Sequence, residues 1–486
     1  MSYINELPRS GRTASYGADD KPPAFADDKS VHEVDVTVTE VDQAFEDLVK
    51  EEEDHDIKLR TMSWQKTAVL LFGDQVCLAI MAQAWSFKVL GWIPGLITTF
   101  LSGAIFWLTS YTLWQFMMRN PKVRDICDIG RLLFGGSRLA YEFTGIMLLA
   151  NNSMLAGFHV LTGAKILNTL SNHAMCTVYF SVIVTIASIV LSLPRTLHHV
   201  SHMCTVSAAC MFVAIVLQLV FAGIEDHPAS GYGGEWPEMG AAVKTSIFPV
   251  EGTTWIQCLN AVLNISFLWI PQILFPTFIN EMRRPQDFPK ALAALAGASF
   301  CLFIVPAVVG YAYLGQYAEA PAFGSLETLY KKISFAPVLV PTIVIGVIYS
   351  NVSAKYVFQR VLANSRHQHS NTVVGWGVWG AIVTAFWAVA FIFGSTIPSM
   401  GDFLSLLGSV FDSQYGFIFW AIAYYQLFKG RFFTSKLRTL ITVAHAIIMV
   451  MGLFLLGPGV YAAVEAIRED YAGAVRPAFA CANLAI

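Results

Sequence analysis

The chain has 486 residues, of which 55% are hydrophobic and only 13% are charged. A soluble domain carries about 25% charged residues, so this composition excludes a soluble globular protein. The formal net charge is −3 and the eight cysteines form no CxxC motif. Neither nucleic-acid binding nor a zinc or redox centre is therefore indicated.

Residues 1–63 are polar and end in an acidic stretch that runs from Glu46 to Asp56. They contain too little apolar surface to offset the entropy lost on ordering, which predicts a disordered acidic tail. No apolar segment near the first residue has the features of a secretion signal.

Eleven apolar runs follow the tail. A bilayer core about 30 Å thick requires about 20 apolar residues per helix. The runs that meet this length cover residues 66–87, 92–117, 139–165, 174–193, 203–223, 254–279, 289–313, 336–362, 373–394, 403–428 and 439–464. The sequence thus predicts an all-α integral membrane domain over 64–464 with about eleven transmembrane helices.

The distribution of Lys and Arg orients these spans. With the N-terminus inside, the inner loops hold sixteen Lys and Arg residues and the outer loops hold seven. The predicted outer loop 224–253 is acidic. Cytoplasmic loops retain positive charge, so we expect a cytoplasmic N-terminus and a short extracytoplasmic tail at 465–486.

The first span carries unusual polarity, with Asp74, Gln75, Gln83 and Lys88 along one apolar run. Intramembrane ionisable residues often mark substrate or ion paths. Asp74 either titrates or orients the unwound backbone of a broken helix, or it is satisfied near the cytoplasmic interface, about 12 Å beyond Lys66. Both readings stay open at this point.

The sixth span contains Pro271 and Pro276, each of which removes a backbone donor and favours a kink. Spans one and six open two halves of five helices each, at about 66–223 and 254–428, followed by an extra helix at 439–464. This arrangement is typical of an inverted-repeat transporter that binds its solute between two broken helices.

Other polar residues are less informative. Asn152 and Asn351 could face the same cavity, although hydrogen bonding between helices is equally consistent with them. His198, His199 and His202 lie in a predicted inner loop without partner carboxylates, so no metal site is expected. No nucleophile and base constellation points to an enzyme.

Four stretches carry a family resemblance, namely Leu90–Gly95 (LGWIPG), Leu167–His173 (LNTLSNH), Leu193–Leu197 (LPRTL) and Glu281–Leu292 (EMRRPQDFPKAL). Through them the chain resembles the fungal branch of the amino acid/auxin permease family, within the amino acid–polyamine–organocation superfamily. The similarity extends from about residue 63 to about residue 433. It implies a leucine-transporter-like inverted repeat and proton-coupled import of neutral or aromatic amino acids.

The resemblance also implies a substrate site between spans one and six. Its acidic residue becomes Asp74, where the family more often has Glu, and Asp74 is the expected proton-coupling group. The residues expected to bind substrate are Asp74, Cys77, Leu78, Ala79, Ile80, Met81, Ala82, Asn152, Leu268, Trp269, Gln272 and Asn351.

The same stretches depart from the family pattern. The family usually reads something like G-x-L-S-L-P after the acidic residue of span one. Here Ala79, Met81, Ala82, Gln83 and Ala84 stand in its place, without the Gly and Pro. In span six, Pro271-Gln272 replaces a Gly-containing turn followed by His. The pocket is therefore predicted to be altered while the scaffold is retained. This leaves open a dedicated carrier or exporter of a secondary-metabolism precursor or product.

The sequence thus predicts a secondary active symporter that works by alternating access. Its partners would be a small amino-acid-like substrate and the lipid bilayer, without nucleic acid, and it would need no cofactor beyond a coupling proton. The plasma membrane is the expected location, with the vacuolar membrane as the alternative. A non-transporting amino acid sensor is a further hypothesis.

Overall fold

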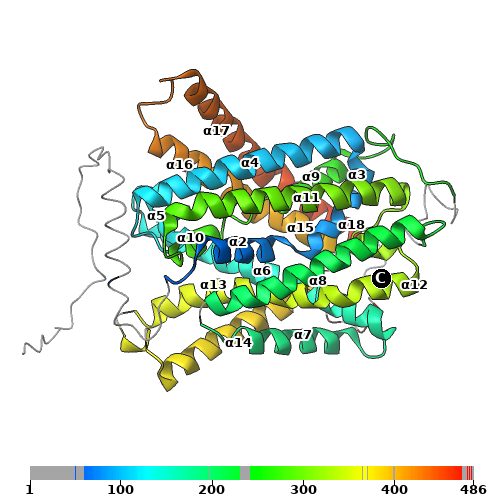
Figure 1. The fold of residues 1–486 in the computed structure, drawn as a ribbon, viewed down its shortest axis with the longest axis horizontal. Coiled ribbons are helices and arrows are strands. Elements are labelled where there is room, and N and C mark those ends of the chain that lie inside the picture. Colours follow the sequence, from blue (N-terminus) through cyan, green and yellow to red (C-terminus); the bar gives the residue numbers. More distant parts are fainter. Residues whose placement is uncertain are drawn as a thin grey trace, which may run out of the picture.

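The protein is described by a computed structural model that covers residues 60–195, 197–229, 241–363, 365–368, 370–397 and 400–472, with Lys50, Phe479, Cys481 and Asn483. Most of the predicted tail at 1–63, and the side chains of His198 and His199, lie outside the described residues. The described part is all-helical, and most of its helices lie alongside one another in one direction (Figure 1).

The longer helices are α2 (Trp64–Gln75), α3 (Gln83–Leu90), α4 (Trp92–Arg119), α5 (Ile126–Leu133), α6 (Arg138–Ser171), α7 (Thr177–Leu191), α8 (Leu197–Ile224), α9 (Trp255–Phe267), α10 (Phe275–Asn280), α11 (Phe288–Leu314), α12 (Thr328–Phe335), α13 (Leu339–Val361), α14 (Val373–Thr396), α15 (Met400–Leu407), α16 (Phe419–Leu427), α17 (Lys436–Phe454) and α18 (Val460–Ala472). Two π-helical segments, η7 (Gly408–Ile418) and η8 (Leu455–Gly459), continue α15 and α17. Short 3₁₀ turns cover η1 (Leu78–Ala82), η2 (Pro285–Asp287), η3 (Gly315–Tyr317), η4 (Ala322–Ser325), η5 (Ala336–Val338) and η6 (Arg366–Gln368).

Every predicted apolar run coincides with one helix or with two or three consecutive ones. Among the described residues, seven helical stretches are long and apolar enough to cross a membrane by themselves. The pair formed by Trp64–Gln75 and Leu78–Leu90 meets the same criterion together and is bent by 45°. The predicted all-α membrane fold is confirmed.

The helices form two groups. In the first group, α11 packs against α2, α3 and α4, and α9 packs against α3 and α4. In the second group, α6, α7, α13 and α14 pack against one another. In Figure 1, α2 lies on the side of the first group that faces the second, with α4 and α11 on one side of it and α7 and α14 on the other.

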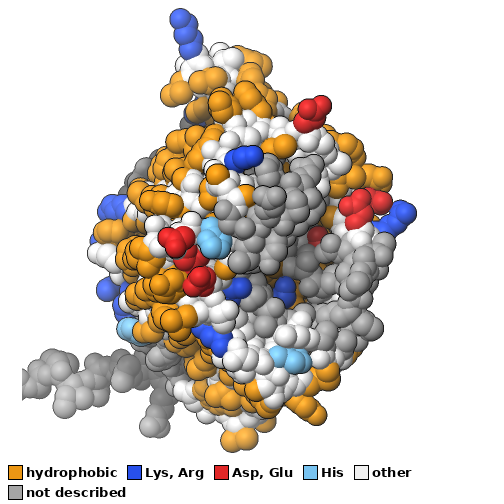
Figure 2. Space-filling model, turned by 90° about the vertical axis from the view of Figure 1, so that its right-hand side faces the viewer, with side chains coloured by type: hydrophobic (Ala, Val, Ile, Leu, Met, Phe, Trp, Pro, Cys, Tyr) orange, Lys and Arg blue, Asp and Glu red, His pale blue; other side chains and the backbone are white. Residues whose placement is uncertain are grey.

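Apolar side chains face outward around the bundle. Ile97 on α4, Ile146 on α6 and Ile186 on α7 are 59%, 67% and 56% exposed. In the end-on view of Figure 2, hydrophobic side chains cover much of the perimeter. Such extensive apolar exposure would be a liability in water and is what a surrounding bilayer requires.

Local chemistry fixes several helix boundaries. Thr254 and Gln257 form a capping box at the start of α9, with bonds of 3.2 and 2.9 Å. Asp125 caps α5 through the backbone N–H groups of the next turn. Between α3 and α4, Gly91 has a φ of +80°, and a Cβ there would lie 2.7 Å from the backbone carbonyl oxygen of Ile247. Only glycine fits this turn.

Candidate substrate site

Spans one and six are both broken, and their breaks lie against each other. Helix α2 ends at Gln75, Cys77 is extended, and the chain resumes as a 3₁₀ turn before α3. Span six breaks between α9 and α10, at the predicted Pro271. The backbone groups freed at these breaks are available to a solute.

Gln75 connects the two breaks. Its Nε2 donates to the carbonyl oxygen of Leu268, the residue directly after α9, over 3.0 Å. Its Oε1 accepts a hydrogen bond of 2.6 Å from the Ser299 hydroxyl on α11. A second, weaker link joins Gln83 Nε2 to the carbonyl of Asn264 at 3.4 Å. The two broken helices are thus tied together by polar side chains of span one.

Asp74 lies in the last turn of α2 and is only 4% exposed. Its Oδ1 has no hydrogen-bond partner among the described residues. The hydroxyl of Tyr349 on α13 lies beside the carboxyl group. Asp74 is therefore buried beside α13, and its role in proton coupling or substrate binding remains a prediction.

The predicted lining residues of span one form the 3₁₀ turn and its preceding residue. Cys77 is 8% exposed, and Leu78 to Ala82 are at most 3% exposed. The whole stretch is thus enclosed by protein. The helix is broken here although the Gly and Pro of the family pattern are missing. Hydrogen bonds from Gln75 and Gln83 to the backbone of span six flank the break on both sides.

The predicted residues of span six point to the first helix group. The Trp269 ring contacts Phe106 on α4 and Phe303 on α11, with centroid distances of 5.8 and 4.8 Å. Gln272 donates from Nε2 to the Thr109 hydroxyl of α4 over 3.1 Å. Both side chains stabilise the break from the side of α4, and their role toward a substrate remains a prediction.

Asn152 and Asn351 lie in the second group. Asn152 donates to the Ser353 hydroxyl over 2.9 Å and so joins α6 to α13. Asn351 donates to the carbonyl of Val347 in its own helix, and its Oδ1 has no partner among the described residues. Of the two, Asn351 alone retains a buried polar atom that a solute could engage.

Sequence reasoning missed Asp412 in the tenth span. The residue lies in η7, is 7% exposed, and its Oδ2 has no hydrogen-bond partner in the described chain. A second ionisable residue within an apolar run is the same signal that identified Asp74. The side-chain oxygens of Asn260 and Asn264 on α9 also have no hydrogen-bond partner among the described residues. These oxygens can accept hydrogen bonds from a cationic or protonated group.

One end of the bundle is closed by the segment before α2. Met62 pairs with the Glu281–Arg283 backbone through hydrogen bonds of 3.0 and 2.8 Å, and Arg60 donates to the Asn280 side chain over 3.0 Å. Glu281 also forms an ion pair with Lys355 of α13. The start of span one and the end of span six are thus tied together there, and the ion pair joins them to α13 of the second group.

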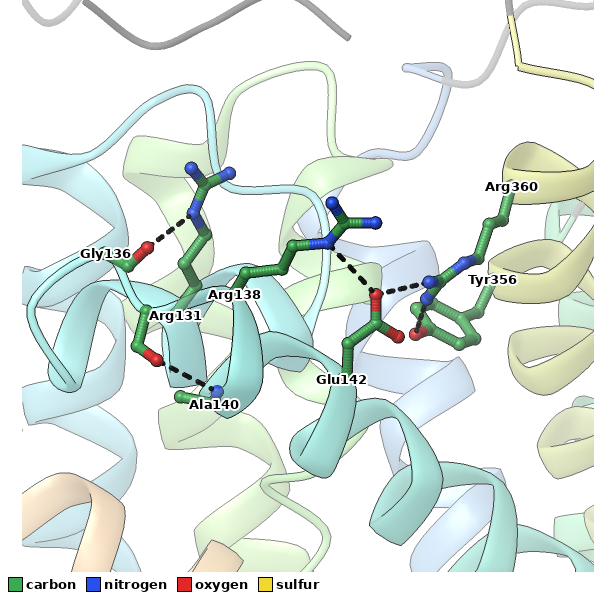
Figure 3. Close-up of polar contacts among 8 residues, drawn as sticks. Arg131, Gly136, Arg138, Ala140, Glu142, Tyr356 and Arg360 are labelled. Carbon is green, nitrogen blue, oxygen red and sulfur yellow. Dashed lines mark hydrogen bonds and ion pairs between the residues drawn. The ribbon is translucent and has the colours of Figure 1, made fainter. Parts of the chain in front are cut away.

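A small pocket adjoins this pair and is lined by Arg124, Asp125, Thr277, Glu281 and Lys355, among others. Burial, reinforced by the nearby Asp128 carboxylate, raises the pKa of Asp125 to about 7. At the same end, Glu142 of α6 is paired with Arg138 and with Arg360 of α13, and Arg360 also donates to the Tyr356 hydroxyl (Figure 3).

Two adjoining broken helices, an apolar outer surface and a buried carboxyl group define a polytopic secondary transporter with a leucine-transporter-like fold. Residues 60–465 match the family described as transmembrane amino acid transporter protein, and the chain belongs to that family.

Fungal relatives cover nearly the whole chain. The N amino acid transport system protein of Neurospora crassa is 26% identical over 432 residues, which is 88% of this chain and 90% of the relative. A transmembrane transporter of Gibberella moniliformis is 27% identical over 435 residues, 88% and 89% of the two chains. One of Fusarium pseudograminearum is 26% identical over 469 residues, 96% of each chain.

Solved structures share the fold. The nucleobase-cation-symport transporter Mhp1 has a TM-score of 0.52 at 15% identity, covering 85% of this chain and 93% of its own. MhsT in complex with L-phenylalanine has a TM-score of 0.50 at 14% identity, covering 84% and 99%. A Na⁺-coupled sialic acid symporter has a TM-score of 0.52 at 11% identity, covering 90% and 97%.

Proposed function

We propose that the protein is a proton-coupled carrier of a neutral or aromatic amino acid, or of a metabolite derived from one. The observation that carries the proposal is the buried Asp74 carboxyl at the meeting point of two broken helices. The name of the Neurospora crassa relative, an amino acid transport system protein, supports an amino-acid-like substrate.

The substrate would bind between the breaks. Carbonyl groups freed at the ends of α2 and α9 suit an ammonium group, and N–H groups freed at the start of η1, after the extended Cys77, suit a carboxylate. Alternating access would follow from rocking of the first helix group against the second. Polar contacts such as those of Gln75 lie within the first group, so they can persist while the groups move.

Proton coupling would use Asp74. An ionised carboxylate that is buried without a full set of partners is unfavourable, so the group is expected to bind either a proton or the substrate ammonium. Tyr349 belongs to the opposing helix group, so the Asp74 environment changes whenever the groups separate.

The proposed orientation places the N-terminus in the cytoplasm and the C-terminal tail outside. A disulfide between Cys176, directly before α7, and Cys481 supports it, because disulfides persist in oxidising compartments. Both cysteines lie on the side that the Lys and Arg count assigns to the exterior. We place the protein in the plasma membrane, where the disulfide would face the medium.

The second candidate is a carrier dedicated to a secondary-metabolism precursor or product. The enclosed lining from Cys77 to Ala82, which departs from the family pattern, is the observation that favours it. A sensor without turnover would keep the same pocket.

The deciding experiment measures uptake of a radiolabelled panel by yeast that lacks its own amino acid permeases, at acidic and slightly alkaline pH. The panel includes cyclic and basic amino acids. Saturable uptake that is faster at acidic pH supports a proton-coupled importer. If the purified protein binds a substrate but the surface-localised protein takes none up, the sensor is favoured instead. If cells export a preloaded amino acid derivative, the metabolite carrier is favoured.

A further inference from the structure

The tenth span is interrupted by an unusual backbone segment. Between α15 and α16, residues Gly408–Ile418 form the π-helix η7 over eleven residues. π-helical turns are rare, occur mostly as short bulges, and are frequent at functional sites because they re-aim side chains. Asp412 lies in the middle of this segment.

The Asp412 carboxyl faces the outer half of broken span six. A Cβ built on Gly408 would lie 3.8 Å from Asp412 Oδ2 and 3.5 Å from the Leu263 carbonyl oxygen of α9. Gly408 therefore lies close both to the Asp412 carboxyl and to the backbone of α9. Asp412 Oδ2 has no hydrogen-bond partner among the described residues, although the side chain is more than nine-tenths buried.

Tyr349 on α13 lies in the neighbourhood of both carboxyl groups, and its hydroxyl lies beside Asp74. The three residues come from spans one, eight and ten, which belong to different parts of the bundle.

Titratable groups lie on η7 itself and on the elements packed against it, and three of them have partners of their own. Tyr415 on η7 donates to the Thr144 carbonyl over 3.1 Å, and Tyr424 on α16 bonds the Thr442 hydroxyl at 3.0 Å. His445 on α17 bonds the Thr112 hydroxyl at 3.1 Å and stacks on Tyr424. The remaining ones are Asp402 on α15, Cys258 on α9, Tyr111 and Arg119 on α4, Tyr425 on α16, Lys436 and Arg438 on α17, and Tyr461, Glu465, Arg468 and Glu469 on α18.

We propose that Asp412 is a second proton-binding carboxyl group of the transporter, in addition to Asp74. The inference rests on the proposed transport function and deepens it. A lone carboxylate in the membrane interior requires a proton or a cation, and no described basic side chain is recorded in contact with Asp412. With two such carboxyls, one can hold a proton while the other holds the substrate ammonium.

The test measures protonation directly on the purified full-length protein. Infrared difference spectra between acidic and alkaline pH, in sodium-free buffer, report carboxyl groups that gain a proton. The wild type is expected to show a titrating band that disappears in Asp412→Asn and shifts in frequency in Asp412→Glu. Asp402→Asn is the matched control on the same span and is expected to keep the band. Tyr349→Phe is expected to shift the pH at which it appears.

An Asp412→Asn spectrum identical to that of the wild type would overturn the proposal, as would a band that never titrates. If Asp412→Asn does not fold, the frequency shift in Asp412→Glu shows whether the band belongs to this residue. Transport is measured in parallel on the same variants. If Asp412 titrates while the wild type moves no substrate, the proposed function fails and the protonation site stands.

Discussion

The Glu281 carboxylate, directly after α10, is paired with the Lys355 ammonium on α13, and the two side chains are only 3% and 12% exposed. Glu281 belongs to the first helix group and Lys355 to the second. The pair therefore spans the boundary across which the groups must separate if the bundle opens at this end. The Glu142–Arg360 pair lies at the same end but joins α6 to α13 within the second group (Figure 3).

Breaking the Glu281–Lys355 pair should favour a conformation in which this end of the bundle is open. Lys355→Met removes the ammonium partner of a nearly buried carboxylate, which costs about 3–5 kcal/mol for a fully buried pair. We expect a lower melting temperature and faster thiol labelling of a cysteine placed at Thr277, which lines the adjoining pocket. Adding Glu281→Gln should recover part of the stability, because it removes the uncompensated charge.

Arg360→Met is the matched control for this prediction. It breaks a half-exposed pair within one helix group, where an ion pair is worth about 0–1 kcal/mol, so labelling at Thr277→Cys should stay at the wild-type rate. Equal labelling rates in Lys355→Met and Arg360→Met would contradict a role for the Glu281–Lys355 pair in closure.

Asp74→Asn should abolish accumulation driven by a pH gradient while leaving the fold intact. The amide has nearly the same shape as the carboxyl group but cannot bind and release the coupling proton. Substrate exchange between the two sides, which needs no net proton movement, should persist. The comparison is uptake against an imposed pH gradient with and without a protonophore, and normal accumulation by the variant would rule out coupling through Asp74.

Much of this fold could be predicted from the sequence. The bilayer requires each span to be about 20 residues long and apolar, and such runs can be recognised in a single sequence. Pro271 marked the break in span six, because a proline disrupts the helix at its own position and can be recognised from the sequence alone. The break at Cys77 could not be located from helix-breaking residues, since it depends on bonds from Gln75 and Gln83 to backbone almost two hundred residues away. The Glu281–Lys355 and Cys176–Cys481 pairs likewise depend on tertiary contacts.

Helices α6 and α14 approach closely at a pair of glycines. A Cβ at Gly394 would lie 2.4 Å from the carbonyl oxygen of Gly157, so Gly394→Ala must push the helices apart. We expect a loss of about 1–3 kcal/mol, the usual cost of overpacking. Gly380 on the same helix has no neighbour within 4 Å of a built Cβ, and Gly380→Ala should be neutral or slightly stabilising. Melting curves of the two purified variants decide, and equal stability would contradict the close approach.

The disulfide between Cys176 and Cys481 predicts which side of the membrane carries the C-terminus. In intact cells, a membrane-impermeant maleimide should not label either residue until an impermeant reductant is added. Cys176→Ser should free Cys481 for labelling without reduction, and Cys481→Ser should do the same for Cys176. The double variant provides the background from the six other cysteines. Labelling that requires permeabilised cells would place both residues in the cytoplasm, where thiols are kept reduced, and would reverse the proposed orientation.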